Sequence, residues 1–210
     1  MYLNASNANV GGAVVVSLRC PACGQRGTFT PFPNAHDLTI PEGSGSLAAG
    51  YRACPSPECA ALVFIIANHA QQLIISYPPQ RLDFDSTNVT AAVANALREA
   101  VTCHANECYV AAAIMVRKTL EELCSDRQAQ GSNLKERLKD LRAKVVLPAE
   151  LLDGLDDLRL LGNDAVHIES KEFNTIGREE VEVGIEFAKE VLKAVYQYSA
   201  LLNRLRGLKK

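Results

Sequence analysis

Two pairs of closely spaced cysteines constrain the N-terminal part of this 210-residue chain more than any other feature. Cys20 and Cys23 flank a Pro-Ala dipeptide, and Cys54 and Cys59 are separated by four residues. Two residues between cysteines let both sulfur atoms of a tight turn face one ion, and zinc prefers four such ligands in a tetrahedron. The sequence therefore predicts one structural Zn²⁺ held by all four cysteines. A site filled by four cysteines leaves no open coordination position for catalysis.

Other interpretations of these cysteines stay open. They can be scattered buried or reactive thiols, or Cys20 and Cys23 can form a redox pair. A redox pair requires a helix N-terminus in a βαβ setting, whereas the surrounding sequence is rich in strands. The sequence shows no secretory signal pattern, so the spacing favours metal binding over disulfides. The remaining cysteines fall in predicted helices and are expected to be small buried apolar residues: Cys103, Cys108 and Cys124.

Short runs of β-branched and apolar residues predict strands in the first part of the chain. These strands are expected at residues 13–18, 28–32, 62–66 and 73–76. Residues 33–50 contain proline, glycine, serine and asparagine with little periodicity, so a loop is predicted there. Tyr77-Pro78-Pro79 is expected to form a stiff linker, because proline fixes its own backbone and cannot pair within a sheet. We therefore predict a small β domain resembling a zinc ribbon over residues 1–80.

The pattern changes to helical spacing after Asp85. Helices are predicted at residues 89–104, at residues 107–126, around Leu134 to Leu141, from Pro148 towards His167, and at residues 178–206. Proline favours the first turn of a helix, which places the start of the fourth helix at Pro148. The prediction for residues 81–210 is therefore an antiparallel helical bundle. The fold class of the whole chain is α+β, mainly α.

Composition and charge limit the classes of function. Hydrophobic residues make up 48% of the chain, which is enough for a core. The net charge of −2 gives no general argument for binding nucleic acid or an anionic membrane. The longest apolar run, residues 60–67, is the size of a strand and shorter than the roughly 20 residues of a membrane helix. We expect a soluble, cytoplasmic protein of bacterial type without membrane contact.

Three polar residues of the fourth predicted helix share one stripe. Arg159, Asn163 and His167 are spaced four residues apart, so on a continuous helix they lie on the same face. One interpretation is metal-independent cleavage of RNA, in which histidine moves a proton, arginine stabilises the phosphate and asparagine orients either one. The structural interpretation is that Asn163 caps a break in the helix and His167 satisfies a buried carbonyl.

Two blocks of residues resemble a known family. The first block contains Cys108-Tyr109, Ala111-Ala112-Ala113 and Arg117-x-x-Leu120-Glu121, and the second is Leu158-Arg159-x-x-Gly162-Asn163-Asp164-Ala165-x-His167. With the cysteine pairs and Tyr77-Pro78, these blocks resemble the domain-of-unknown-function family 4145 (DUF4145), from about Cys20 to Tyr198. The Gly-Asn-Asp-Ala-x-His sequence is the most specific part of this resemblance.

That family is similar to the HEPN group, the higher eukaryote and prokaryote nucleotide-binding domains. The resemblance implies a helical bundle that is often a homodimer, with RNase sites at the dimer interface and roles in phage defence or toxin systems. The RNase motif is an arginine followed by four to six residues and a histidine, commonly with a polar residue after the arginine. Here Asn163 and His167 match, but Gly162 precedes Asn163, and seven residues separate Arg159 from His167.

These observations lead to one expected function and two alternatives. The expected function is a zinc-containing, HEPN-like binding or regulatory module in bacterial defence or nucleic-acid-linked regulation, with RNA or a protein as its partner. The first alternative is a metal-independent RNase in which His167 is the general acid or base and Arg159 binds the phosphate. The second is a structural domain whose β part docks onto another protein.

Overall fold

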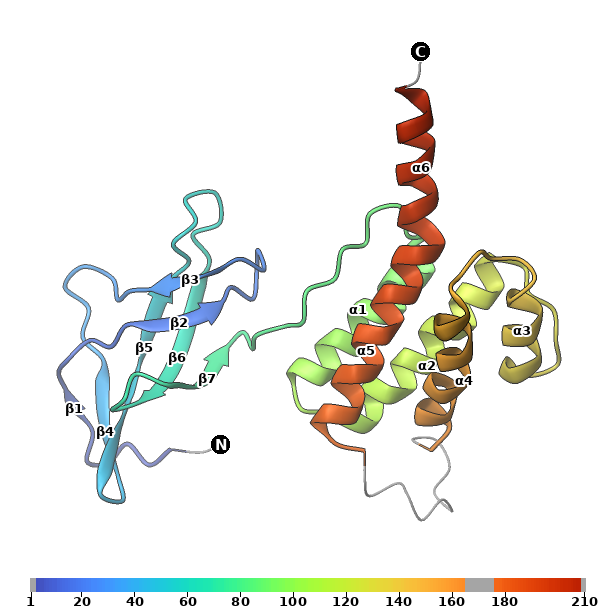
Figure 1. Ribbon diagram of the computed structural model, residues 1–210. Coiled ribbons are helices and arrows are strands. Elements are labelled where there is room, and N and C mark those ends of the chain that lie inside the picture. The colour runs from blue at the N-terminus through green and yellow to red at the C-terminus, as the bar shows by residue number, and fades with distance from the viewer. Residues whose placement is uncertain (1–2, 165–175, 209–210) are drawn as a thin grey trace. The chain divides into compact units, whose positions relative to one another are not determined.

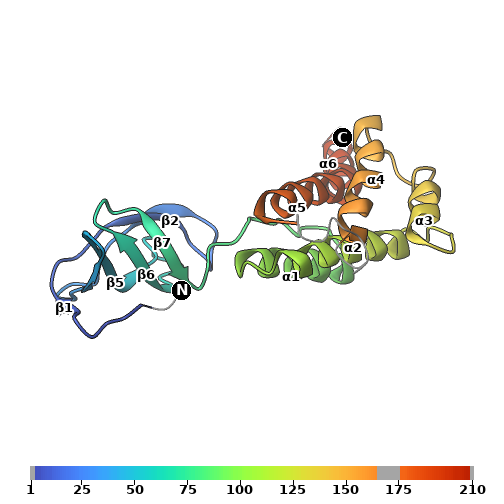
Figure 2. The ribbon, with the colours of Figure 1, turned by 90° about the horizontal axis from the view of Figure 1, so that it is seen from below.

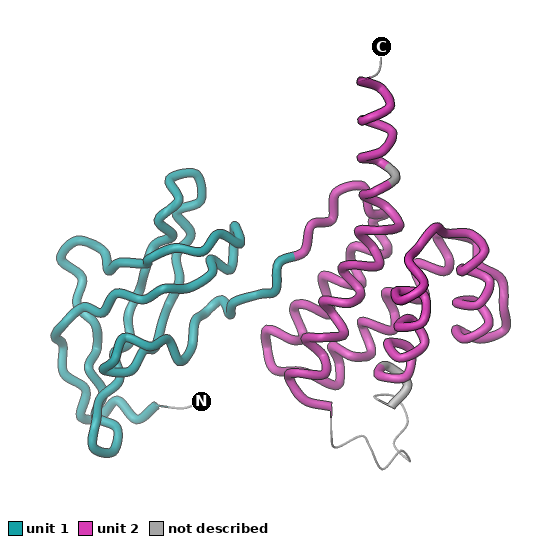
Figure 3. The backbone as a smooth tube through the Cα atoms, in the orientation of Figure 1, with its two compact units in different colours: residues 1–83 teal, residues 84–210 magenta. Residues whose placement is uncertain are grey.

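The structure is a computed structural model that describes residues 3–164 and 176–208. The chain divides into two compact units, Met1–Asp83 and Phe84–Lys210, which are coloured separately in Figure 3. The first unit contains antiparallel β-sheets and the second contains helices (Figure 1). The predicted α+β class is therefore confirmed.

The first unit is built from two antiparallel sheets. The five-stranded sheet has the order β1 (Asn9–Val10), β4 (Leu38–Glu42), β5 (Gly45–Ala53), β6 (Leu62–Asn68) and β7 (Leu73–Tyr77). The two-stranded sheet pairs β2 (Val16–Arg19) with β3 (Arg26–Phe29). The four strands predicted from β-branched runs overlap β2, β3, β6 and β7. In β2, buried and exposed positions alternate with the period of two that a strand imposes.

Strands β4 and β5 form a hairpin where the sequence predicted a loop over residues 33–50, so that prediction was wrong. Gly43, with a φ of +56°, lies in the connecting turn, and Pro41 pairs with Ser46. The sequence of β5 contains no β-branched residue, so local propensity gave no signal for a strand. Its backbone groups are instead satisfied by pairing with β4 on one side and β6 on the other, and this pairing outweighs propensity.

Side chains from both sheets meet in one apolar core. Val63 and Ile65 of β6 and Phe29 of β3 are completely buried in it. The cluster consists of Val16, Leu18, Cys20, Phe29, Cys54, Val63, Ile65 and Ala67. Two of the predicted metal ligands therefore belong to the core of the first unit, and the packing of the sheets fixes their positions.

The second unit is a bundle of helices (Figures 1 and 2). Its elements are α1 (Ala91–Ala105), α2 (Tyr109–Asp126), α3 (Leu134–Leu141), α4 (Ala149–Asp164), α5 (Arg178–Leu192), the π-helical turn η2 (Lys193–Gln197) and α6 (Tyr198–Gly207). Helix α2 packs against α1, α4 and α5 and so forms the centre of the unit. All five predicted helices are confirmed, and the last one continues from α5 into α6 through the π-helical turn.

Close helix packing in this unit depends on two glycines. A Cβ atom on Gly184 of α5 would lie 2.7 Å from Cδ2 of Leu161 in α4. A Cβ atom on Gly154 of α4 would overlap the ring of Phe187 in α5. The absence of both side chains lets α4 and α5 approach each other closely. Among the described helices, none combines the length and apolar character needed to cross a membrane.

Candidate metal centre

The first cysteine pair lies in the turn between β2 and β3. Cys20 directly follows β2, and its N–H donates a hydrogen bond of 2.9 Å to the carbonyl of Gln25. The N–H of Gly24 donates a hydrogen bond of 2.9 Å to the carbonyl of Cys20, and the φ of Gly24 is +75°. Glycine adopts this left-handed conformation without steric cost. The chain therefore turns back on itself and brings Cys23 close to Cys20.

The second pair lies in the loop that follows β5. Cys54 directly follows the last residue of β5, and the N–H of Cys59 donates a hydrogen bond of 3.0 Å to the carbonyl of Ser56. This loop packs against β3, because a Cβ atom on Gly27 would lie 2.7 Å from Cγ of Pro55. Only glycine at this position leaves room for the proline ring, so the two cysteine-bearing turns come together at one end of the sheets.

The four sulfur atoms form a compact group. The Sγ atoms of Cys20 and Cys59 are 3.8 Å apart, as are those of Cys23 and Cys54. All four Sγ atoms lie within 4.8 Å of one another. A Zn–S bond of about 2.3 Å places neighbouring sulfur atoms about 3.8 Å apart at the corners of a tetrahedron. The geometry is therefore that of a four-cysteine metal site, whose ligands come from both sheets.

The thiols of this group differ in their acidity. Burial disfavours the Cys20 thiolate, but hydrogen bonds from the N–H groups of Cys23 and Ala22 lower the pKa of Cys20 to about 7. Burial, together with contacts with the other cysteines, raises the pKa of Cys54 to about 12, although the N–H of Ser56 acts to lower it. The Cys20 thiolate thus forms readily, whereas the raised pKa values of Cys54 and Cys59 oppose their ionisation in the same small volume. A divalent cation resolves this conflict, because it stabilises all four thiolates together.

The other cysteines lie in the helical unit and are not part of this group. Cys124 is completely buried in α2, and burial raises its pKa to about 11. Cys103 is partly buried, and burial raises its pKa as well. Cys108 is exposed at the start of α2, contrary to the expectation of a buried apolar residue. The interpretation as small apolar residues therefore fits Cys124 best.

The predicted polar stripe is only partly within the described structure. Arg159 lies in α4, where its Nε atom is 3.6 Å from Oδ1 of Asp156. The Arg159 side chain is 14% exposed, and its buried Nε atom has no hydrogen-bond acceptor among the residues that the structure describes. The backbone of Asn163 belongs to the last turn of α4, and His167 lies outside the described residues. The geometry of the predicted catalytic group therefore stays untested.

His104 is a buried titratable residue that the sequence did not single out. It lies in the last turn of α1, is 6% exposed, and has its Nε2 atom 3.6 Å from Oε2 of Glu182. Within the described part of the chain, this Nε2 atom has no hydrogen-bond partner. Burial lowers the pKa of His104, the carboxylate of Glu182 acts to raise it, and Arg178 acts to lower it. The sequence gave no signal for this pair, because the two residues meet only when α5 packs against α1.

Comparison with known proteins assigns the helical unit. A family model with the description "Domain of unknown function (DUF4145)" matches residues 98–208, which is more than half of the chain. No curated protein and no solved structure matches the chain. The matched region begins within α1, so the four-cysteine group lies outside it.

Proposed function

The chain belongs to the domain-of-unknown-function family DUF4145, and we propose that it is a non-catalytic binding or regulatory module. In this proposal the first unit is a ribbon stabilised by one structural Zn²⁺, and the second is a HEPN-like bundle. The module acts in bacterial defence or in regulation linked to nucleic acid. The observation that carries the proposal is the group of four cysteine Sγ atoms within 4.8 Å of one another.

The position of the cysteines explains why a metal would be structural here. Cys20 and Cys23 follow β2 of the two-stranded sheet, whereas Cys54 and Cys59 follow β5 of the five-stranded sheet. One ion bound by all four would therefore join the two sheets at the edge of their shared core. A small β unit gains much of its stability from such a link, because its apolar core alone is small.

The surroundings of Arg159 support a binding module over the RNase alternative. A phosphate-binding arginine needs donors that are free to meet the phosphate oxygens. The Arg159 side chain is largely covered, and the nearby Asp156 carboxylate offsets its charge. Four cysteine ligands also leave a bound zinc ion without an open position for a substrate.

The first experiment measures metal content and the stability that the metal provides. Purified protein is expected to contain about one zinc ion per chain, as one four-cysteine site predicts. Replacing Cys23 and Cys59 together by serine should abolish binding, whereas Cys108→Ser, at an exposed cysteine outside the group, should leave it unchanged. Hydrogen exchange should show that a chelator exposes the strands but not the helices. The proposal would be contradicted if the strands of the metal-free protein stayed fully protected from hydrogen exchange.

The second experiment separates a binding module from a ribonuclease. Mixed cellular RNA is incubated in EDTA with the wild-type chain and with His167→Ala, and circular dichroism confirms that the helical unit stays folded in both. The proposal predicts no cleavage by either protein. Cleavage by the wild type that is lost in His167→Ala would refute the non-catalytic proposal and establish the RNase alternative.

A further inference from the structure

The long C-terminal helical segment has its charges divided between its two halves. Its first half, residues 178–190, is acidic, with Glu179, Glu180, Glu182, Glu186 and Glu190 against Arg178 and Lys189. Residues 191–210 contain no acidic residue and carry Lys193, Arg204, Arg206, Lys209 and Lys210. Two such segments side by side repel each other when parallel and attract each other when antiparallel.

Helix α6 also presents large apolar side chains to solvent. All of the residues 201–208 are exposed, and Figure 1 shows α6 extending beyond the other helices of its unit. The apolar side chains are Tyr198, Leu201, Leu202, Leu205 and Leu208, each exposed by at least 47%. Their spacing of three and four residues places them on one face of the helix. An exposed apolar stripe of this kind is typical of an interaction surface.

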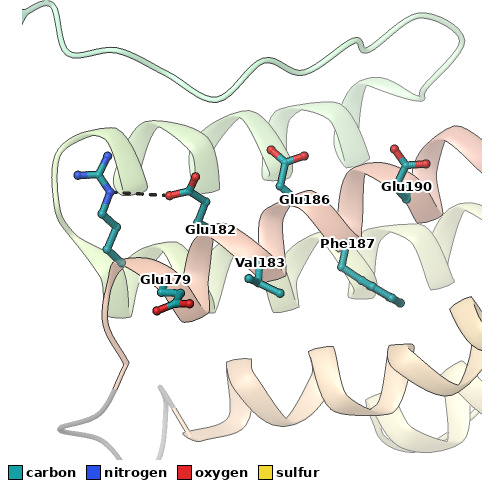
Figure 4. Close-up of a pocket in the computed structure, with 7 residues that line it drawn as sticks. Glu179, Glu182, Val183, Glu186, Phe187 and Glu190 are labelled. Carbon is teal, nitrogen blue, oxygen red and sulfur yellow. Dashed lines mark ion pairs between the residues drawn. The ribbon is translucent and has the colours of Figure 1, made fainter.

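A groove with a matching character runs along α5 (Figure 4). Its volume is about 680 Å³. Figure 4 shows Glu182, Glu186 and Glu190 on one side of the helix and Val183 and Phe187 on the other. Val183 is 63% exposed although it is apolar. The groove therefore combines an apolar surface with an acidic border.

The dimensions and charges of the two elements fit each other. Helix α6 has ten residues and is about 15 Å long, and the groove from Glu179 to Glu190 spans about 16 Å of helix. Arg204 and Arg206 lie on either side of Leu205, each roughly 100° around the helix from it. A helix that lays Leu205 on the apolar surface therefore projects its two arginines to opposite sides, and one of them points towards the row of glutamates (Figure 4).

We propose that α6 of one copy of the chain docks antiparallel into the α5 groove of a second copy. The arrangement is reciprocal, because an antiparallel pair of identical helices has a twofold axis and each copy supplies both a helix and a groove. Leu201 and Leu205 cover Val183 and Phe187, and one of the two arginines of α6 faces the acidic border. The surface is independent of the proposed zinc site, so either proposal can fail without the other.

A charge exchange tests this interface with the full-length chain. Variant A carries Arg204→Glu with Arg206→Glu, and variant B carries Glu179→Lys with Glu186→Lys. Alone, each variant places like charges opposite each other, so its dimer should weaken on the order of a hundredfold. In a mixture of A and B, each α6 faces an α5 groove of opposite charge on the other variant. A heterodimer of A and B should therefore form. The control Lys135→Glu with Lys139→Glu makes the same charge change on the exposed face of α3 and should leave the dimer intact.

Sedimentation velocity at several protein concentrations and salt concentrations measures the outcome. The expected results are a wild-type dimer that weakens as salt rises and a heterodimer that forms only in the mixture. Circular dichroism and metal content confirm that A and B are folded. A monomeric wild type, or variants that dimerise like the wild type, would overturn the proposal. It is also overturned if a monomeric wild type binds single-stranded RNA or anionic vesicles and variant A does not.

Discussion

Removing the carboxylate of Asp37 should destabilise the first unit more than any surface substitution in it. Arg52 is fully buried and uses all five of its N–H groups. Two of them donate to the carboxylate of Asp37 over 2.9 and 2.7 Å, and the others donate to the carbonyls of Val14 and Tyr51. The variant Asp37→Ala leaves the guanidinium charge buried without a counter-ion, and it removes the acceptor of two Arg52 N–H groups and of the Val14 N–H.

The expected loss follows from the burial of the pair. The exposed fractions of the Arg52 and Asp37 side chains are 0% and 3%, and breaking one partner of such a pair costs about 3–5 kcal/mol of unfolding free energy. A matched control is the ion pair of Arg19 and Asp83, whose side chains are 27% and 65% exposed. Asp83→Ala should cost about 0–1 kcal/mol, because solvent screens an exposed pair.

Hydrogen exchange read by mass spectrometry measures both variants in separate peptides of the two units. A loss of about 3–5 kcal/mol speeds exchange in β5 and β6 by roughly two to four powers of ten. Peptides from α2 should exchange at the wild-type rate in both variants. The reasoning is refuted if Asp37→Ala loses no more stability than Asp83→Ala.

Replacing both charged partners tests the cause of the loss. The double variant Asp37→Leu with Arg52→Met contains no buried charge, so it should lose less stability than the sum of the two single replacements. It should still be less stable than the wild type, because the carbonyl of Val14 loses two hydrogen bonds. If the stability loss of the double variant equals the sum of the two single losses, the two charges do not stabilise each other.

Three further substitutions give distinct outcomes. Gly50→Ala places a Cβ atom against the carboxylate of Asp37, so its loss of stability in hydrogen exchange should approach that of Asp37→Ala. Asn133→Ala removes the side-chain oxygen that caps α3, which should cost about 1 kcal/mol in a thermal or urea melt of the helical unit. The folded-state pKa of His104 is lowered from 6.5, so the unfolded chain binds the proton first as pH falls. Stability of the helical unit should therefore fall below about pH 6.5 and level off below the folded pKa, and His104→Gln should remove this component of the pH dependence.

The parts of the molecule that the sequence predicted are those that depend on local chemistry. The helices follow from apolar spacing, and the turn at Cys20 to Gly24 follows from the conformational freedom of glycine. The cysteine spacing predicted the four-cysteine group because two short turns carry all of its members. In each case, short local segments contain the information, although the meeting of the two cysteine pairs depends on the fold that brings their turns together.

The parts that the sequence missed depend on contacts between distant segments. Strand β5 resembles a loop in composition, and Gly50 is required there because the buried carboxylate of Asp37 occupies the space of a side chain. The pair of His104 and Glu182 likewise forms only when α5 packs against α1. The spacing of apolar residues could not reveal this pair, because nothing in the sequence around His104 or around Glu182 indicates that the two residues meet.

The first unit contains two polar links that act on opposite ends of the same strand. Before β2, the carbonyl of Val14 accepts hydrogen bonds from Arg52 of β5. After β2, Cys20 lies beside the sulfur atoms of Cys54 and Cys59, which follow β5. Strand β2 pairs only with β3 among the described strands, so no backbone ladder joins it to the larger sheet. The two links therefore do what a ladder does elsewhere: they hold β2 over the core, where its buried side chains contact β6. Loss of either link leaves β2 fixed at one end, whereas loss of both leaves the small sheet held by apolar contacts, by the backbone bridge between Pro31 and Arg52, and by the hydrogen bond from the Arg19 N–H to Gln80.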